Sequence, residues 1–468
     1  MASTDTKDIR VAQIGFRAQG LEHIRAIRQN IVALCDVDER VLHDQRALLR
    51  DTYRQPVDTY TDFRRLLERH DIDAVSIATP NHTHALIAIE AARAGKDVYV
   101  EKPVSHNIWE GRQLVAAARR FNRVIQSGTQ SRSSTAVREA IRFVHSGSLG
   151  EIRLVTGTCY KPRMSIGKLE KPLAIPSTID YELWCGPAAK VELYRPQLHY
   201  DWHWDFNTGN GDLGNQGIHQ MDVARWFLGE STMAPSVFSV GGRLGYDDAG
   251  NTPNTQIVYH GYKKAPLIFE VRGLPRARRF QDKGWSTNMD SYRRSRVGLV
   301  VQCERGFVVV ANYLAATAYD ERGNTIKRWK ADATDHHGGW LQAVAARDPK
   351  LLTAEIYEGH VSSALCHAGN ISLRLGKGAP AAEIADQVAA IDPLANSVDR
   401  MMGHLRANEI DIDGRNVLTM GQWLDVDPSD EAFAGNDRAN EFRTRDYRKP
   451  FVVPSLEQDL KGHSISAL

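Results

Sequence analysis

The sequence has few cysteines and no apolar run that approaches membrane-spanning length. Its five cysteines are Cys35, Cys159, Cys185, Cys303 and Cys366. They are scattered and include no CxxC pair, which argues against a disulfide framework and against a structural zinc site. Residues 1–7 also lack the basic and apolar regions of a signal peptide. We therefore expect a cytoplasmic setting and no membrane partner.

Neither sign of charge dominates the chain. Lys and Arg number 59 against 57 Asp and Glu, for a net charge of +2, and no basic stripe runs along the sequence. This balance argues against nucleic-acid binding and favours a small polar ligand. Because 468 residues exceed what one hydrophobic core usually organises, we expect more than one domain.

Apolar stretches alternate with helical patterns in the first part of the chain. Strands are predicted at 9–14, 31–35, 73–78 and 97–100, and helices at 20–28, 62–69, 83–94 and 109–121. This alternation predicts a doubly wound parallel sheet of the Rossmann type. Beyond about residue 130, strands are predicted at 152–158, 236–242, 256–260, 267–271, 298–302 and 307–310. They indicate an α/β domain with an open, mainly antiparallel sheet.

A glycine-containing turn follows the first predicted strand. Residues 15–20 read Gly-Phe-Arg-Ala-Gln-Gly, so Arg17 stands where the GxGxxG pattern has its middle glycine, and Asp36 follows the next strand. Free amides at a helix N-terminus suit a pyrophosphate, and an acidic residue at this spacing holds the adenosine ribose and repels a 2′-phosphate. We predict NAD binding by Gly15, Phe16, Arg17, Gly20 and Asp36. A strand-to-helix turn without ligand is the alternative.

Two further motifs follow predicted strands. One is Ala-Thr-Pro-Asn-His-Thr-His at 78–84, and the other is Glu-Lys-Pro at 101–103. Ligands bind at the carboxyl ends of strands in doubly wound sheets. These segments therefore add a set of predicted cofactor-binding residues: Thr79, Pro80, Asn81, His84, Glu101 and Lys102.

With these motifs in this order, the sequence resembles the Gfo/Idh/MocA oxidoreductase family. The resemblance implies that Lys102 lies in the active site beside the nicotinamide, and that Pro103 forms a turn, often cis, that aims this lysine. Without the resemblance, Lys102 is equally well read as a solvated surface lysine.

The resemblance continues at 209–222, where the family has a glycine-rich stretch with a D-x-G-x-H signature. Here Asn215 replaces the aspartate, and His219 follows four residues later. The resemblance implies that His219 is the catalytic acid/base, since imidazole titrates near neutral pH. Spacing of four residues on a helix puts both side chains on one face, and Asn215 is expected to orient Lys102 or a substrate hydroxyl. A core histidine is the alternative for His219.

Histidines, carboxylates and tryptophans crowd residues 199–205. We interpret the rings of Tyr200, Trp202 and Trp204 as flat faces and His203 as a polar contact for a sugar ring. Core aromatics or a metal site are alternatives; we predict no metal, because hydride transfer to NAD needs none. Tyr160, Lys161 and Arg163, after a predicted strand, are weaker candidates for substrate binding, and a solvated strand end explains them equally well.

The predicted domains are an NAD-binding domain at 1–127, a substrate-binding and oligomerisation domain at 128–380, and a C-terminal extension at 381–468 that packs on both. The resemblance implies a homodimer or homotetramer formed through the open sheet. Polar residues recurring along 358–374 suggest a solvated helix face.

Three functions remain open. The leading one is NAD-dependent oxidation of a secondary hydroxyl on a sugar, glycoside or cyclic polyol. The second is redox-neutral cleavage of a glycoside through oxidation, elimination, hydration and reduction, and the third is a non-catalytic NAD-sensing regulator.

Overall fold

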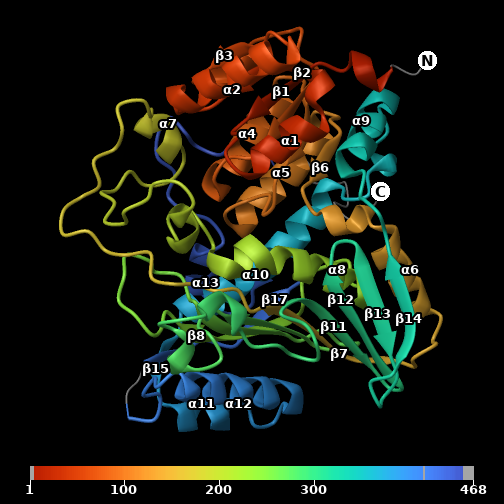
Figure 1. Ribbon diagram of the computed structural model, residues 1–468, viewed down its shortest axis with the longest axis vertical. Helices are drawn as coiled ribbons and strands as arrows, with labels where there is room; N and C mark the ends of the chain where they lie inside the picture. Colours follow the sequence, from red (N-terminus) through yellow and green to blue (C-terminus); the bar gives the residue numbers. More distant parts are fainter. Residues whose placement is uncertain (1–4, 415–416, 457–468) are drawn as a thin grey trace.

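The computed structural model describes residues 5–414 and 417–456, and it contains two sheets stacked along the long axis of the molecule (Figure 1). The domain with the first sheet lies at the top of this view, and the larger sheet lies below. Within the described residues, no helix is both long and apolar enough to cross a membrane.

The first sheet is parallel and has the strand order β3-β2-β1-β4-β5-β6. The strands are β1 (Val11–Ile14), β2 (Ile31–Cys35), β3 (Asp58–Tyr60), β4 (Ala74–Ile77), β5 (Asp97–Val100) and β6 (Ile125–Ser127). Their crossovers contain α1 (Gln19–Ala26), α2 (Glu39–Tyr53), α3 (Phe63–Leu67), α4 (Asn81–Arg93) and α5 (Ile108–Arg120). The predicted Rossmann sheet is confirmed.

The carboxyl ends of β1 and β4 form the natural ligand site of this sheet. All four residues of each strand are buried, because helices cover both faces of the sheet. The chain leaves β1 toward β2 on one side and later returns to β4 on the other. A crevice therefore opens at the point where the strand order reverses.

The second sheet is mainly antiparallel, as predicted, and β7 with β10 is its parallel pair. Its main path runs β14-β13-β12-β11-β7-β10-β9-β8-β16-β15. The long strands are β7 (Ile152–Cys159), β8 (Ser236–Gly242), β9 (Thr255–His260), β10 (Leu267–Arg272), β11 (Val297–Cys303), β12 (Gly306–Asn312), β13 (Ala315–Tyr319) and β14 (Thr325–Lys330). The short ones are β15 (Lys377–Ala379), β16 (Leu418–Met420), β17 (Leu424–Asp427) and β18 (Ala432–Phe433).

Helices cover both faces of the second sheet (Figure 1). On the side of the first domain lie α6 (Thr135–His145), α8 (Ile218–Leu228) and α10 (Ile356–Arg374). On the other side, α11 (Ala381–Val388) and α12 (Asp392–Ala407) pack on β8, β9 and β10. They cover part of the sheet face that was predicted to be open. The remaining helices are α7 (Tyr181–Cys185), α9 (His336–Ala346) and α13 (Asp437–Glu441).

The prediction that polar residues of 358–374 form a solvated helix face is wrong. His360, His367 and Asn370 are buried, because α10 is packed between α5 of the first domain and α8 of the second. Beyond α13 the chain returns to the first domain, where Phe451 and Val453 join its hydrophobic core. The two domains therefore share extensive packing away from the crevice.

Candidate active site

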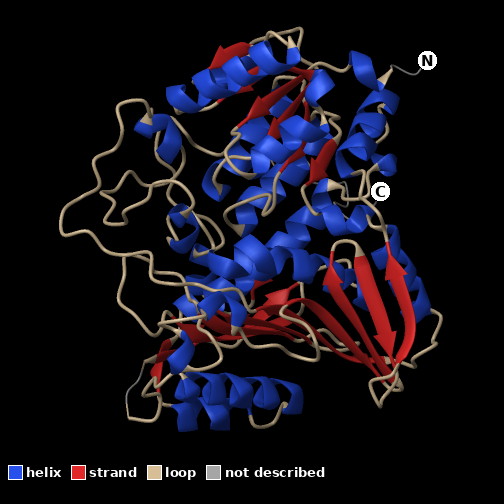
Figure 2. Cartoon of the chain, viewed as in Figure 1, coloured by secondary structure: helices blue, strands red, loops and turns tan. Residues whose placement is uncertain are grey.

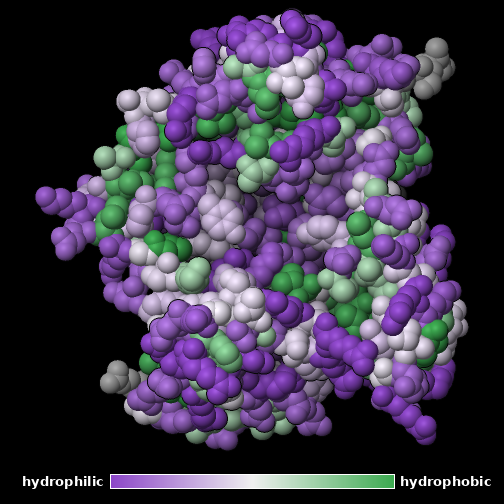
Figure 3. All heavy atoms as spheres, viewed as in Figure 1, coloured by the Kyte–Doolittle hydropathy of each residue, from purple (hydrophilic) through white to green (hydrophobic). Residues whose placement is uncertain are grey.

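A cavity of about 580 Å³ lies at the carboxyl edge of the first sheet. The surface is hollowed between the upper domain and the large sheet in Figure 3. Most of the cofactor-binding residues predicted from the sequence line this cavity: Gly15, Phe16, Arg17, Asp36, Thr79, Pro80, Asn81, His84, Glu101 and Lys102.

The glycine turn after β1 is tightly packed against the loop after β4. Gly15 has a φ of +71°, and a Cβ there would lie 2.7 Å from the Thr79 side chain. Gly20 does not line the cavity; a Cβ at Gly20 would lie 2.2 Å from the Gly15 carbonyl oxygen, so this glycine allows α1 to approach β1. The turn thus fits the roles of the first and last glycines of a dinucleotide loop.

Arg17 replaces the middle glycine without blocking the cavity. Its side chain is 38% exposed, and its guanidinium lies 4.0 Å from the Asp38 carboxylate. One buried guanidinium nitrogen, Nη1, has no hydrogen-bond partner among the described residues. An orphaned donor beside the N-terminus of α1 fits a phosphate ligand.

Asp36 lies at the end of β2, where the adenosine ribose is expected. Its carboxylate accepts a hydrogen bond from the Asp38 backbone N–H at 3.0 Å. Burial raises the pKa of Asp36 to about 6, although the backbone hydrogen bonds favour the ionised form. The carboxylate is therefore ionised at neutral pH and available to ribose hydroxyls.

Glu101 and Lys102 form the chemical end of the cavity. The His23 ring nitrogen Nε2 lies 3.0 Å from a Glu101 carboxylate oxygen. Burial opposes ionisation of Glu101, but this hydrogen bond and the charge of Lys102 outweigh it and lower the pKa of Glu101 to about 2. Across a cis Lys102–Pro103 bond the chain turns, and the Lys102 ammonium donates to the backbone carbonyl of Asn215 at 2.9 Å.

His84 joins the two loops that carry these motifs. Its ring nitrogens each lie 2.7 Å from a carbonyl oxygen, that of Pro103 on one side and that of Thr79 on the other. The ring is buried, and burial lowers its pKa. His84 thereby fixes the Lys102 turn relative to the rest of the predicted cofactor site.

Asn215 and His219 line different cavities. Asn215 belongs to a π-helical turn, Leu213–Gly217, and lines the large cavity with Lys102. His219, in α8, lines a neighbouring cavity of about 230 Å³ against β11 and β12. The expectation of a shared face assumed a regular α-helix, whereas a π-turn has more residues per turn and shifts the phase. It is the Asn215 backbone carbonyl that contacts Lys102.

The His219 ring is poised as a free base. It is 5% exposed, and its Nδ1 has no hydrogen-bond partner among the described residues. Burial, with a further contribution from the Lys102 charge, lowers the pKa of His219 to about 3. The ring of Tyr313 lies 5.0 Å away.

The loop of residues 160–212 brings only some of the predicted substrate residues to the large cavity. Trp202 and His203 line it, and their rings stack at 3.6 Å. Trp204 is buried outside it, 4.7 Å from the Arg163 guanidinium, which pairs with both carboxylate oxygens of Asp212. Tyr160 donates its hydroxyl to Glu270 at 2.6 Å. The structure therefore places Tyr160, Arg163 and Trp204 away from the cavity.

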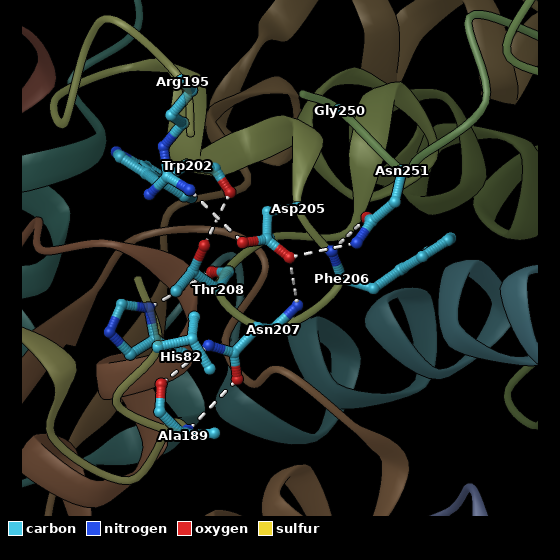
Figure 4. Close-up of polar contacts among 12 residues, drawn as sticks. His82, Ala189, Arg195, Trp202, Asp205, Phe206, Asn207, Thr208, Gly250 and Asn251 are labelled. Carbon is cyan, nitrogen blue, oxygen red and sulfur yellow. Dashed lines mark hydrogen bonds and ion pairs between the residues drawn. The ribbon is translucent and has the colours of Figure 1, made fainter. Parts of the chain in front are cut away.

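The same loop brings Tyr200, one of the interpreted flat faces, to the large cavity. It also supplies lining residues that the sequence analysis missed: Leu183, Trp184, Gly186, Gln197 and His199. Most of it is irregular (Figure 2). Polar contacts hold its end, where Asp205 accepts from Arg195 at 3.3 Å and from the Asn251 side chain at 3.2 Å (Figure 4). The His82 ring lies between the carbonyl groups of Trp184 and Thr208, and so links the loop to α4.

The 160–212 loop also crosses the segment that follows Asp36. Asp180 donates its backbone N–H to the Val37 carbonyl, and Glu39 donates to the Thr178 carbonyl, each at 2.9 Å. A small apolar cluster of Ile179, Trp184, Cys185, Leu193 and Leu198 packs with Val37. The loop therefore walls the cavity at its adenosine end as well as near Lys102.

Comparisons with known proteins agree with this architecture. Residues 9–129 match the model of an oxidoreductase family with an NAD-binding Rossmann fold, and residues 133–269 match the C-terminal alpha/beta domain of the same family. The dehydrogenase WlbA of Bordetella pertussis, solved with NADH and UDP-GlcNAcA, superposes with a TM-score of 0.56 at 18% identity, over 78% of this chain and 97% of that one.

Two curated relatives match shorter stretches. Levoglucosan dehydrogenase of Pseudarthrobacter phenanthrenivorans is 29% identical over 38% of this chain and 39% of its own length. A glycosyl hydrolase family 109 protein of a Shewanella species is 30% identical over 31% of this chain and 33% of its own length. The chain thus matches about a third to two fifths of these relatives.

The two family models together cover more than half of the chain, and the glycine turn, the Asp36 carboxylate and the strand-end motifs all lie in one cavity. The chain belongs to the Gfo/Idh/MocA family of oxidoreductases, whose N-terminal Rossmann domain binds NAD.

Proposed function

We propose that this protein oxidises a secondary hydroxyl of a sugar or sugar derivative, with bound NAD accepting the hydride. The observation that carries the proposal is the Lys102 ammonium, held 2.9 Å from the Asn215 carbonyl on the turn that leads into His219. Lys102 stabilises negative charge on the substrate oxygen, and neutral His219 accepts the hydroxyl proton. Trp202 and His203 supply a stacked face for a sugar ring.

The direct test is reduction of added NAD by a panel of monosaccharides, sugar acids, glycosides and cyclic polyols, followed through nicotinamide absorbance. Turnover with at least one sugar supports the proposal. Tight NAD binding without any change of nicotinamide absorbance across the panel would count against a dehydrogenase. Release of the aglycone from the glycosides would then indicate redox-neutral cleavage, and no release would favour a non-catalytic regulator.

One observation favours a second candidate, redox-neutral cleavage of a glycoside. Such an enzyme keeps one NAD through many turnovers, because the hydride returns to the substrate. The docking of the 160–212 loop on residues 37–39 supports retention, since the loop has to move before the adenosine end of a bound dinucleotide can leave. The family 109 relative is consistent with this candidate.

Loosening this loop is expected to release the cofactor. Leu193 is 4% exposed in the apolar cluster that packs with Val37, so Leu193→Ser removes buried apolar contacts and adds a hydroxyl to that cluster. We expect NAD dissociation, measured by dilution of the NADH-loaded protein and loss of bound-NADH fluorescence, to speed up by about 10-fold or more.

Tyr194→Ser is the matched control, because Tyr194 is the next residue but is 42% exposed. This variant should keep the parent rate of dissociation. If the parent and both variants release NADH equally fast, the loop does not retain the cofactor, and a dehydrogenase that exchanges NAD freely is favoured.

The preference for NAD over NADP is expected to depend on pH. With the Asp36 pKa raised to about 6, the carboxylate is charged above that pH and repels the 2′-phosphate. Below pH 6 it gains a proton, so the affinity ratio measured by titration calorimetry should narrow by about 10-fold between pH 8 and pH 5.

The Asp36→Asn variant separates this effect from titration of the phosphate itself, whose second pKa is also about 6. The variant should bind the two dinucleotides more equally and show only the shallower dependence that the phosphate contributes. A parent ratio that stays constant with pH would contradict the assignment of Asp36.

A further inference from the structure

Two ammonium groups meet at the π-helical turn Leu213–Gly217. Lys102 donates to the backbone carbonyl of Asn215 at 2.9 Å, and Lys161 donates to the side-chain oxygen of Gln216 at 2.5 Å. Asn215 and Gln216 are adjacent in sequence, although the lysines come from different domains: Lys102 follows β5 and Lys161 follows β7. The turn therefore gathers two positive charges beside the place where chemistry is proposed.

Among the described residues, no carboxylate forms an ion pair with the Lys161 ammonium. Within residues 5–414 and 417–456, neither Lys102 nor Lys161 forms an ion pair with a carboxylate within 4.0 Å. Glu101 is engaged by His23 at 3.0 Å, and Asp212 is held by both arms of Arg163. At the position of the family's aspartate, Asn215 is uncharged.

Both lysines are partly buried. Lys102 has the Glu101 carboxylate as a nearby opposite charge, whereas Lys161 pairs with no carboxylate among the described residues. Burial lowers the pKa of Lys102, the Glu101 carboxylate opposes this shift, and the charge of Lys161 lowers the pKa further. An anion placed between them would relieve this repulsion. In contrast, a neutral ligand would leave it in place.

We propose that the substrate is a sugar acid whose carboxylate binds Lys161, while its reacting hydroxyl lies at Lys102. This inference rests on the proposed function and names its substrate class. The neighbouring cavity offers neutral partners for the remaining hydroxyls, including Gln216, Gln220, Asn312 and Tyr313. In the oxidation, the carbinol carbon transfers its hydride to NAD, and the hydroxyl transfers its proton to His219. The carboxylate of the substrate does not change.

The test compares sugar acids with neutral partners of the same stereochemistry. The pairs are D-glucuronate with methyl D-glucoside, D-galacturonate with methyl D-galactoside, and D-gluconate with D-glucitol. Binding to the NADH-loaded protein is measured by titration calorimetry at low and high salt, and NAD reduction is measured in parallel. At least one acid should bind about 10-fold or more tightly than its neutral partner, and added salt should weaken that binding.

Lys161→Gln should raise the KM for the preferred acid by about 10- to 100-fold, with kcat changed much less, because a charged hydrogen bond is lost in the ground state and the transition state alike. Lys161→Arg should restore most of the affinity. Lys168→Gln is the control, since Lys168 lies on the same loop but is 56% exposed and pairs with Asp247.

The inference is overturned if no acid binds more tightly than its neutral partner, or if Lys161→Gln and Lys168→Gln have the same effect. Reduction of NAD by neutral sugars alone would overturn it and leave the proposed dehydrogenase function intact. Tighter binding of an acid without NAD reduction by any sugar would support the charge preference and count against the dehydrogenase.

Discussion

Replacing His219 by asparagine is expected to slow hydride transfer by about 100- to 10,000-fold, the usual contribution of a positioned base. The ring is buried, and its Nδ1 has no protein partner among the described residues, so it is free to accept a substrate proton. The rate should be followed in a single turnover with NAD and the preferred substrate, so that product release does not mask the chemical step.

The pH dependence has a definite sign. A base works in its neutral form, and with a pKa lowered to about 3 the His219 imidazole is already neutral well below physiological pH. We therefore expect the transfer rate of the parent to show no rise from this group between about pH 5 and pH 8, in contrast to an exposed histidine with its pKa near 6.5. Transfer in His219→Asn should be slow across that range.

His260 provides a matched control. It is 1% exposed in β9, both ring nitrogens lack partners among the described residues, and burial lowers its pKa to about 3 as well. It lines neither cavity around the π-turn. His260→Asn should therefore alter stability and leave the transfer rate near that of the parent. Equal rates in the parent and His219→Asn would make His219 structural and redirect attention to His203.

The sequence predicted the first domain well because its signals are local. The four predicted strands β1, β2, β4 and β5 are short and mostly apolar, whereas β3 and β6 are three-residue polar segments that the sequence did not predict. Each motif follows one of the four predicted strands, so the edge of the sheet brings Gly15, Asp36, Thr79 and Lys102 into one cavity. Parallel sheets place successive strand ends together by topology alone. The cofactor site therefore required no knowledge of distant contacts.

The second domain was less predictable because its polar residues find partners far away in the sequence. The Tyr160 hydroxyl donates a hydrogen bond to Glu270, and the Arg163 guanidinium donates to Asp212. Protein carboxylates therefore occupy the polar groups of both residues, which are not available to a ligand. The π-turn is another case, since nothing in the spacing of Asn215 and His219 distinguishes it from an α-helix. The polar helix α10 is buried because α5 comes from another domain to cover it.

Replacing Lys102 by alanine is expected to lower turnover by about 100- to 1,000-fold, while NAD still binds. The ammonium is fixed by the Asn215 carbonyl and stands ready to stabilise negative charge on the substrate oxygen. Burial lowers the pKa of Lys102, so the group loses its charge at a lower pH than a free lysine does. Turnover of the parent should therefore fall on the alkaline side before the usual lysine pKa of about 10.4.

Lys96 separates this effect from the cost of deleting any buried lysine. Lys96 and Lys102 flank β5 at opposite ends, and Lys96 is 5% exposed, with its ammonium bonded to the carbonyl of Ile72 at 2.8 Å. Lys96→Ala should destabilise the protein without changing kcat or the fall of kcat at alkaline pH. Lys102→Ala should lower kcat and remove the fall at alkaline pH that titration of Lys102 causes. Binding of NAD to both variants is measured by titration calorimetry. If Lys102→Ala failed to bind NAD, the Lys102 ammonium would be needed for cofactor binding. If Lys102→Ala turned over as fast as Lys96→Ala, the ammonium would have only a structural role. Charge stabilisation at the reacting oxygen would then have to come from elsewhere in the cavity.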